Sequence, residues 1–151
     1  MMEAERIFAA VMRHYTELGQ ACLSEFTLKT NRRPDILCLA KDGQITIIEV
    51  KSSVQDFRSD KKWQEYLAWA DRFFFAVDDG FPTDILPDES QCGIIITDGF
   101  DCHHLRDAPY QKLPAARRNA LIKQLARTAM LRHYHSQLSS DILPLDDPVE
   151  G

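Results

Sequence analysis

The fold is decided by the stretch RRPDILCLAKDGQITIIEVK, residues 32–51. It contains two short stretches of strand character, residues 36–40 and 45–50, and the second stretch is rich in β-branched side chains, which favour strands. The residues between them, 41–44, include an Asp-Gly pair, a strong short-range signal of a β-hairpin. The stretch therefore predicts two antiparallel strands joined by a tight turn.

Further helices and strands are predicted on both sides of this hairpin from the spacing of apolar residues. The predicted helices cover residues 3–18, residues 59–71 and a long segment that begins at Pro114. The remaining predicted strands cover residues 21–28, 73–77, 93–97 and 100–106. The resulting α-β-β-β-α-β-β-β-α order predicts a mixed α/β (α+β) fold, in which a mixed central sheet is flanked by helices and followed by an extra C-terminal helix.

Length and composition predict one domain. The chain has 151 residues, of which 44% are hydrophobic and 27% are charged; we expect residues 1–138 to form the domain and the acidic residues 139–151 to form a flexible tail. No apolar run approaches the roughly 18 residues of a membrane span, and the acidic N-terminus, with Glu3 and Glu5, is unlike a secretory signal. We therefore expect a cytoplasmic protein with no membrane partner.

The charge of the chain is unevenly distributed. Eighteen Lys and Arg against 23 Asp and Glu give a net charge of −5, which taken alone argues against a nucleic-acid partner. Residues 29–62, however, contain eight basic and five acidic residues, and residues 112–134 contain six basic and no acidic residues. With a tyrosine that follows the first segment, they supply the candidate DNA-binding residues Arg32, Arg33, Arg58, Lys61, Lys62, Tyr66, Lys123 and Arg127. The alternative for such charges is a solvated turn or helix face.

Charged residues converge at one end of the predicted hairpin. Asp35 opens its first strand, and Glu49 and Lys51 end the second on one shared face, because side chains alternate along a strand. Two neighbouring carboxylates repel each other unless a cation lies between them, and oxygen ligands suit Mg²⁺ or Mn²⁺. We therefore predict that Asp35, Glu49 and the backbone carbonyl of Val50 hold the metal. Lys51 beside it would be a catalytic group that orients water and neutralises developing charge.

The register of the hairpin decides whether these residues meet. A two-residue turn would point Asp35 away from Glu49, whereas a three-residue loop with a glycine bulge would place Asp35 opposite Lys51 and bring all three together. We predict the bulged register. Glu25, on the neighbouring strand, is a further candidate residue of the catalytic site as an acidic ligand, with an exposed strand glutamate as the alternative.

These motifs resemble those of two related protein families. The order of elements over residues 1–105, together with Pro34, Asp35, Glu49 and Lys51, is similar to the PD-(D/E)xK nuclease superfamily, whose core has the order α-β-β-β-α-β. More narrowly, the chain resembles the MmcB-like DNA-repair proteins. The residues that carry this narrower resemblance are 32–35, 49–53, 56–58, 62–63, 66, 71–73 and 116–118.

The resemblance implies a bacterial DNA-repair protein with a restriction-endonuclease-like core, in which Asp35 and Glu49 bind the metal and Lys51 assists catalysis. The expected function is therefore Mg²⁺-dependent hydrolysis of phosphodiester bonds in DNA by a deoxyribonuclease. The alternative is a non-catalytic DNA-binding or adaptor module that keeps the nuclease fold, because the superfamily includes proteins that bind DNA without cutting it. In either case the expected partners are DNA and other repair proteins. The oligomeric state stays open, a homodimer included.

Overall fold

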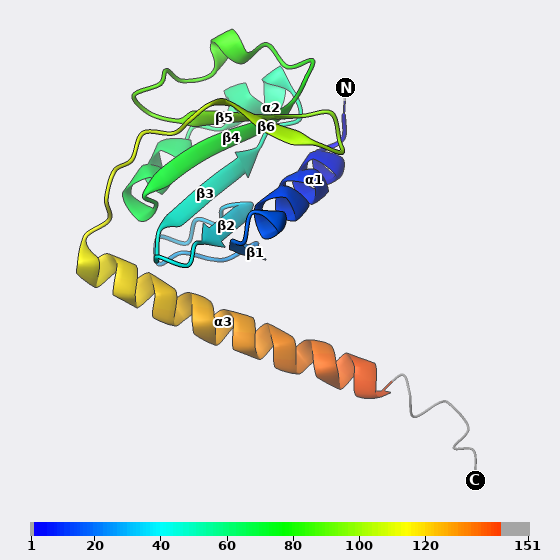
Figure 1. Ribbon diagram of the computed structural model, residues 1–151, viewed down its shortest axis with the longest axis vertical. Coiled ribbons are helices and arrows are strands. Elements are labelled where there is room, and N and C mark those ends of the chain that lie inside the picture. The colour runs from blue at the N-terminus through cyan, green and yellow to red at the C-terminus, as the bar shows by residue number, and fades with distance from the viewer. Residues whose placement is uncertain (1, 143–151) are drawn as a thin grey trace. The chain divides into compact units, whose positions relative to one another are not determined.

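A six-stranded mixed sheet forms the centre of residues 2–115 in the computed structural model (Figure 1). Its strands, in spatial order, are β1 (Ala21–Ser24), β2 (Ile36–Leu39), β3 (Ile45–Val50), β4 (Arg72–Asp78), β5 (Gly93–Thr97) and β6 (Cys102–Arg106). Strands β1 to β3 pair antiparallel, β3 to β5 pair parallel, and β6 returns antiparallel to β5. The mixed sheet and the order of elements confirm the fold class predicted from the sequence.

The structure describes residues 2–142. They belong to two compact units, one that ends at Ala115 and contains the sheet, and one that begins at Ala116 and whose described part is helical. Helix α3 (Ala115–Ile142) continues through residues 139–142, where the sequence pointed to a flexible tail; the rest of that predicted tail, residues 143–151, lies outside the described residues. None of the described helices combines the length and the apolar composition that crossing a membrane requires.

Helix α1 (Ala4–Glu17) covers one face of the sheet, as its apolar periodicity predicts (Figure 1). Ile7 and Val11, four residues apart, point to the same side of the helix and are buried. They belong to one core cluster with Ile48 of β3 and Phe74 of β4. Because side chains alternate along a strand, the residues that neighbour Ile48 and Phe74 face the other side of the sheet.

That other side is covered by α2 (Val54–Ser59) and by the 3-10 helix η1 (Trp63–Trp69). Phe57 of α2 packs edge-on against Phe75 of β4, with 5.4 Å between the ring centroids. Trp63 of η1 stacks on Phe73 with 6.0 Å between the centroids. An aromatic layer therefore supports the central strands on the face opposite α1.

The single helix predicted over residues 59–71 is wrong. Helix α2 starts earlier, because the hydroxyl of Ser53 accepts a hydrogen bond from the Asp56 N–H at 3.0 Å and caps it. The helix ends at Ser59, because the next residue, Asp60, has an extended backbone and its carboxylate accepts the Lys62 N–H at 2.9 Å. Such a local side-chain hydrogen bond competes with continuation of the helix, so the chain coils again only in η1.

Strand β1 is shorter than predicted, and one long connection carries a short helix. The sequence predicts a strand over residues 21–28, but Glu25 takes a φ of +51°, a left-handed conformation that ends the strand at Ser24. Between β4 and β5 lies the 3-10 helix η2 (Thr83–Ile85). The turn at Glu25 places this residue at the end of the sheet where Asp35 directly precedes β2, and the Glu25 N–H donates to the Asp35 carbonyl at 3.2 Å.

Candidate functional site

The hairpin between β2 and β3 has the three-residue loop that the sequence predicts. The Ala40 N–H donates to the Gln44 carbonyl and the Gly43 N–H donates to the Ala40 carbonyl, both at 3.0 Å. Gly43 takes a φ of +91°, which a glycine adopts without steric cost. This bulged turn fixes the register of the two strands.

The register places the two predicted metal ligands opposite each other. Ile36 pairs with Ile48, so the next position in the ladder sets Asp35 against Glu49. The predicted pairing of Asp35 with Lys51 is wrong by two residues. The three-residue loop makes Ala40 and Gln44 the first pair of the hairpin, and counting back five residues from Ala40 and forward five from Gln44 pairs Asp35 with Glu49. Opposed residues share one face of the sheet, so the two carboxylates meet, as the predicted site requires.

Asp35 and Glu49 are held by backbone hydrogen bonds across the hairpin. The Asp35 N–H donates to Glu49 Oε1 at 2.8 Å, and the Val50 N–H donates to Asp35 Oδ2 at 2.8 Å. Glu49 is only 7% exposed. The main chain therefore fixes both carboxylates beside each other in a largely desolvated position.

The electrostatics of this pair favour a cation. Burial, together with the neighbouring charge of Asp35, raises the pKa of Glu49 to about 8. Burial also raises the pKa of Asp35, outweighing the hydrogen bond from Val50 and the charge of Lys51. Two desolvated carboxylates side by side resist double ionisation. The pair is thus short of the positive charge that a divalent ion would supply.

Lys51 lies beside the pair and binds a third carboxylate. Its Nζ is 2.8 Å from Asp60 Oδ2, and the two side chains are 7% and 17% exposed. Burial opposes ionisation of Asp60, but hydrogen bonds from Lys51 and from the backbone of Lys62 outweigh it and hold the pKa of Asp60 below its usual value. The ion pair therefore ties the segment between α2 and η1 to the end of β3.

A cleft of about 540 Å³ opens at this end of the sheet. Its charged lining is five carboxylates and one ammonium group, from Glu5, Glu25, Asp35, Glu49, Asp56 and Lys51. Within residues 2–142, no group of three or more His, Cys, Asp and Glu side chains is arranged to hold a metal ion. A metal here would therefore rest on two carboxylates and otherwise on main-chain and water oxygens, a ligand set that suits Mg²⁺ or Mn²⁺ better than Zn²⁺ or Cu²⁺.

The predicted DNA-binding residues differ in their surroundings. Those exposed in the unit that contains the sheet are Arg33, Arg58, Lys61 and Lys62, and those exposed on α3 are Lys123 and Arg127. Arg32 is half-buried, with its Nε 3.0 Å from Glu65 Oε2. Arg32 therefore has an acidic partner within the chain, which a phosphate would have to replace.

Tyr66 is not open to a base. It is 7% exposed, and its ring lies nearly parallel to Phe73 with 6.1 Å between the centroids. Burial, and then the charges of Glu49 and Asp35, raise its pKa above the usual value. The assignment of Tyr66 to DNA binding is corrected, because η1 turns this side chain into the aromatic layer.

Two carboxylates that follow β3 were not predicted from the sequence as residues of the site. Asp56 lines the cleft and Asp60 binds Lys51. The signal that could have found them is Ser53 followed by Asp56, a Ser-x-x-Asp pattern typical of a helix start. It predicts that a helix begins at Val54, one turn after Lys51.

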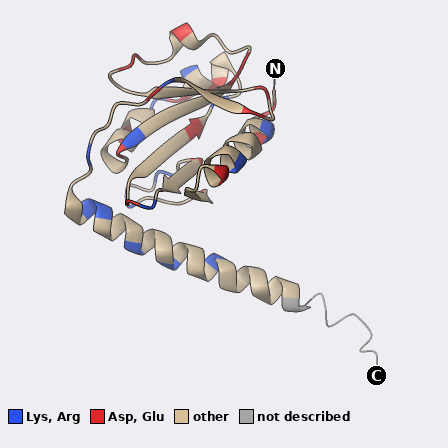
Figure 2. Cartoon of the chain, in the orientation of Figure 1, with Lys and Arg blue, Asp and Glu red and all other residues tan. Residues whose placement is uncertain are grey.

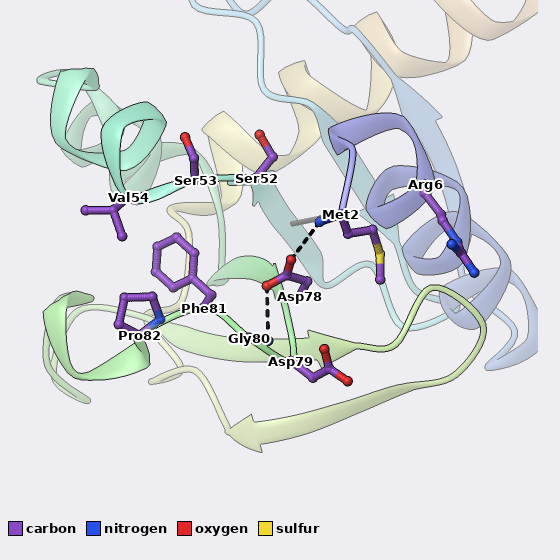
Figure 3. A pocket seen from close by; sticks show the side chains of 10 residues that line it. All are labelled: Met2, Arg6, Ser52, Ser53, Val54, Asp78, Asp79, Gly80, Phe81 and Pro82. Atoms are coloured by element: carbon purple, nitrogen blue, oxygen red, sulfur yellow. Dashed lines mark hydrogen bonds between the residues drawn. The ribbon is translucent and has the colours of Figure 1, made fainter.

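A second hollow, of about 490 Å³, borders the same connection between β3 and α2 (Figure 3). Residues 52–54 of that connection line it, and Asp78 at the end of β4 lies in its wall. The carboxylate of Asp78 accepts the Met2 N–H at 3.0 Å and the Gly80 N–H at 3.2 Å. Asp78 therefore ties the N-terminal segment to the end of β4 and has a structural role.

Comparison with known proteins gives one family and one solved structure. The family model described as "DNA repair protein MmcB-like" matches residues 2–140. The structure of the "SPO1766 protein of unknown function from Silicibacter pomeroyi" is 38% identical and superposes with a TM-score of 0.81, covering 100% of this chain and 96% of that chain. No curated protein matches. Both likenesses extend beyond the sheet into α3.

Proposed function

This chain belongs to the MmcB-like family of DNA repair proteins, and we propose that its part in repair is the metal-dependent hydrolysis of phosphodiester bonds in DNA. The family supplies the DNA-repair role. We add the reaction, its active site at the ends of β2 and β3, and membership of the PD-(D/E)xK nuclease superfamily.

The observation that carries this proposal is the pair of facing carboxylates. Glu49 accepts a hydrogen bond from the Asp35 N–H, Asp35 accepts one from the Val50 N–H, and both carboxylates line the cleft and have raised pKa values. A fold gains nothing in stability from two neighbouring carboxylates whose burial disfavours their charged forms. Such an arrangement is typical of a functional site, where the missing charge arrives with a ligand.

Each residue of the site has a role in the proposed reaction. Asp35, Glu49 and the Val50 carbonyl would hold Mg²⁺ or Mn²⁺, which when bound supplies a Lewis acid for a phosphodiester. Lys51 shares the face of Glu49, and its ammonium group can stabilise charge on the phosphate oxygens once it exchanges Asp60 for DNA. Glu25 is exposed and lines the same cleft, which makes its carboxylate the candidate general base that accepts the proton released from the attacking water.

The DNA backbone would be held by cations at the surface of the same unit. Arg33 follows the half-buried Arg32 and directly precedes Pro34 and Asp35, and it is exposed. Exposed Arg58, Lys61 and Lys62 flank Asp60, the partner of Lys51. Cations at these positions contact phosphates without reading base sequence, so we expect affinity to fall steeply with salt.

The proposal is tested by cleavage of single-stranded, duplex and branched DNA with Mg²⁺, with Mn²⁺ and with a chelator. We expect cleavage that requires the divalent ion and that falls at least about 100-fold in both Lys51→Ala and Glu49→Gln. Lys41→Ala is the matched control, because Lys41 is an exposed lysine of the hairpin loop. Circular dichroism of each variant separates lost chemistry from lost folding. Cleavage that Lys51→Ala leaves unchanged would disprove the proposed site.

The second candidate function is DNA binding without cleavage, and the Lys51–Asp60 ion pair favours it. In a binding module this buried pair would be permanent and Lys51 would never meet a phosphate. The protein would then bind DNA without cutting it, and Asp35→Asn would leave the affinity unchanged. Arg33→Ala or Lys123→Ala would weaken binding about equally for all DNA sequences, because both residues would contact only phosphates.

A further inference from the structure

One side of helix α3 exposes cations and large apolar side chains together. We call it the outer face of α3; its members are Lys123, Arg127, Met130, Leu131, Tyr134 and Leu138. Their spacings of three, four and seven residues place them within one side of an α-helix. The cations occupy its N-terminal half and the apolar residues its C-terminal half.

The apolar half of this face is strongly exposed. Met130 is 71% exposed, Leu131 53%, Tyr134 56% and Leu138 41%. Single exposed apolar residues are ordinary, but four large ones within nine positions on one side of a helix form a contiguous patch. Patches of this kind, rimmed by polar residues, mark surfaces that bind other proteins.

Charge decides which partner fits this face. Residues 112–140 contain six basic and no acidic residues, and the described part of α3 carries Lys and Arg but no Asp or Glu up to Ser140 (Figure 2). A second copy of the helix would set like charges against each other, which disfavours self-pairing. DNA would neutralise Lys123 and Arg127 but would leave Leu131 and Leu138 in water. A segment that carries both acidic and apolar side chains can bind the cationic half and cover the apolar half of this face at the same time.

We propose that the outer face of α3 docks an acidic amphipathic helix of another protein. Apolar side chains of that helix cover Met130, Leu131, Tyr134 and Leu138, and its carboxylates bind Lys123 and Arg127. This is the helix-to-groove mode of recognition, in which apolar anchors supply affinity and charge supplies orientation. The docking surface is independent of the proposed nuclease site, whereas the alternative of DNA binding without cleavage assigns Lys123 to a phosphate instead.

Photo-crosslinking in living cells tests the proposal. The full chain carries p-benzoylphenylalanine in place of Tyr134, and a control chain carries it in place of Ser136, which is exposed and lies on the opposite side of α3. We expect a crosslink at position 134 and not at 136, to a peptide whose sequence is acidic with apolar residues at helical spacing. A crosslink from position 134 to a second copy of this chain or to DNA would overturn the proposal, and so would the absence of any crosslink from that position.

A charge swap in solution then tests the chemistry with a defined probe. The probe is a designed helical peptide with leucines along one side and glutamates beside them, and the matched peptide has lysine in place of each glutamate. Arg127→Glu should weaken binding of the acidic peptide about tenfold and strengthen binding of the lysine peptide. Ala129→Glu adds the same charge on the other side of α3 and should leave both affinities unchanged. Equal binding of the two peptides to the unaltered chain would overturn the proposal.

Discussion

A buried carboxylate lies at each end of β3, and the two carboxylates have opposite electrostatic surroundings. At the start of β3, Asp71 is 1% exposed, and its carboxylate accepts the Ile45 N–H at 2.7 Å and the Leu113 N–H at 2.8 Å. At the end of β3, Glu49 accepts one backbone N–H and faces the carboxylate of Asp35. One carboxylate is surrounded by donors, and the other adjoins a group of its own charge.

This contrast separates a structural acid from a functional one better than burial does. Asp71 joins the start of β3 to the segment after β6, so its charge is offset within the fold. Glu49 has a pKa of about 8, which means that the folded protein alone does not fully stabilise its charge. A buried acid that needs a further cation is a candidate metal ligand. An acid whose oxygens accept hydrogen bonds from N–H groups stabilises the fold.

The largest expected effect is the loss of stability on removing the satisfied carboxylate. Asp71→Ala leaves the N–H groups of Ile45 and Leu113 without their acceptor in the interior, at a cost of about 4 kcal/mol in the free energy of unfolding. Chemical denaturation measures this cost, and Asp84→Ala, at an exposed aspartate of η2, should change it by less than about 0.5 kcal/mol. A loss for Asp71→Ala no larger than that of Asp84→Ala would contradict the structural role of Asp71.

The pH dependence of stability tests the other carboxylate. The pKa of Glu49 is raised to about 8 from an ordinary 4.5, so the folded state holds a proton that the unfolded state releases. Without metal, the contribution of Glu49 to stability is therefore greatest below about pH 4.5, and it falls by about 4 kcal/mol as the pH rises to about 8.

The Glu49→Gln variant isolates this contribution. Its stability should not fall between about pH 5 and pH 8 as that of the unaltered chain does, because the amide does not titrate. Other groups, such as Asp60 with its lowered pKa, contribute to both profiles and cancel in the difference. If the two proteins lose stability in parallel as the pH rises in the presence of a chelator, the pKa of Glu49 is not raised and this prediction is wrong.

A third effect is expected at the ion pair beside the site. Asp60→Asn keeps the shape of the side chain but leaves the ammonium group of Lys51, which is 7% exposed, without its counter-charge. We expect a loss of about 2 kcal/mol in the free energy of unfolding, less than for a fully buried pair because Asp60 is partly solvated. Asp84→Asn controls for the change from acid to amide. Equal stability of the two variants would mean that water solvates Lys51 as well as Asp60 does.

Sequence patterns predicted the hairpin, its three-residue loop and the meeting of Asp35 with Glu49, because alternation and turn chemistry are local. They did not predict that Asp60 would stop α2, since this depends on hydrogen bonds to Lys51 and Lys62 that form only in the folded chain. The burial of Tyr66 was missed for a similar reason: the 3-10 geometry of η1 changes which side chains face the sheet. The structural role of Asp71 was not predicted, although the residue belongs to the family resemblance. The two N–H groups that donate to its carboxylate come from residues 26 and 42 positions away in the chain.

The smallest expected effect concerns a surface ion pair near the site. Arg32 and Glu65 are 33% and 45% exposed, so Glu65→Gln should lower the free energy of unfolding by no more than about 0.5 kcal/mol. The same change frees the guanidinium group of Arg32 and removes a negative charge that repels DNA, so affinity for DNA should rise about threefold at low salt and the gain should shrink as salt is added. Glu89→Gln, at an exposed glutamate before β5, makes the same change in net charge and should leave the affinity nearly unchanged. Equal gains in the two variants would mean that net charge alone acts and that Arg32 does not contact phosphate.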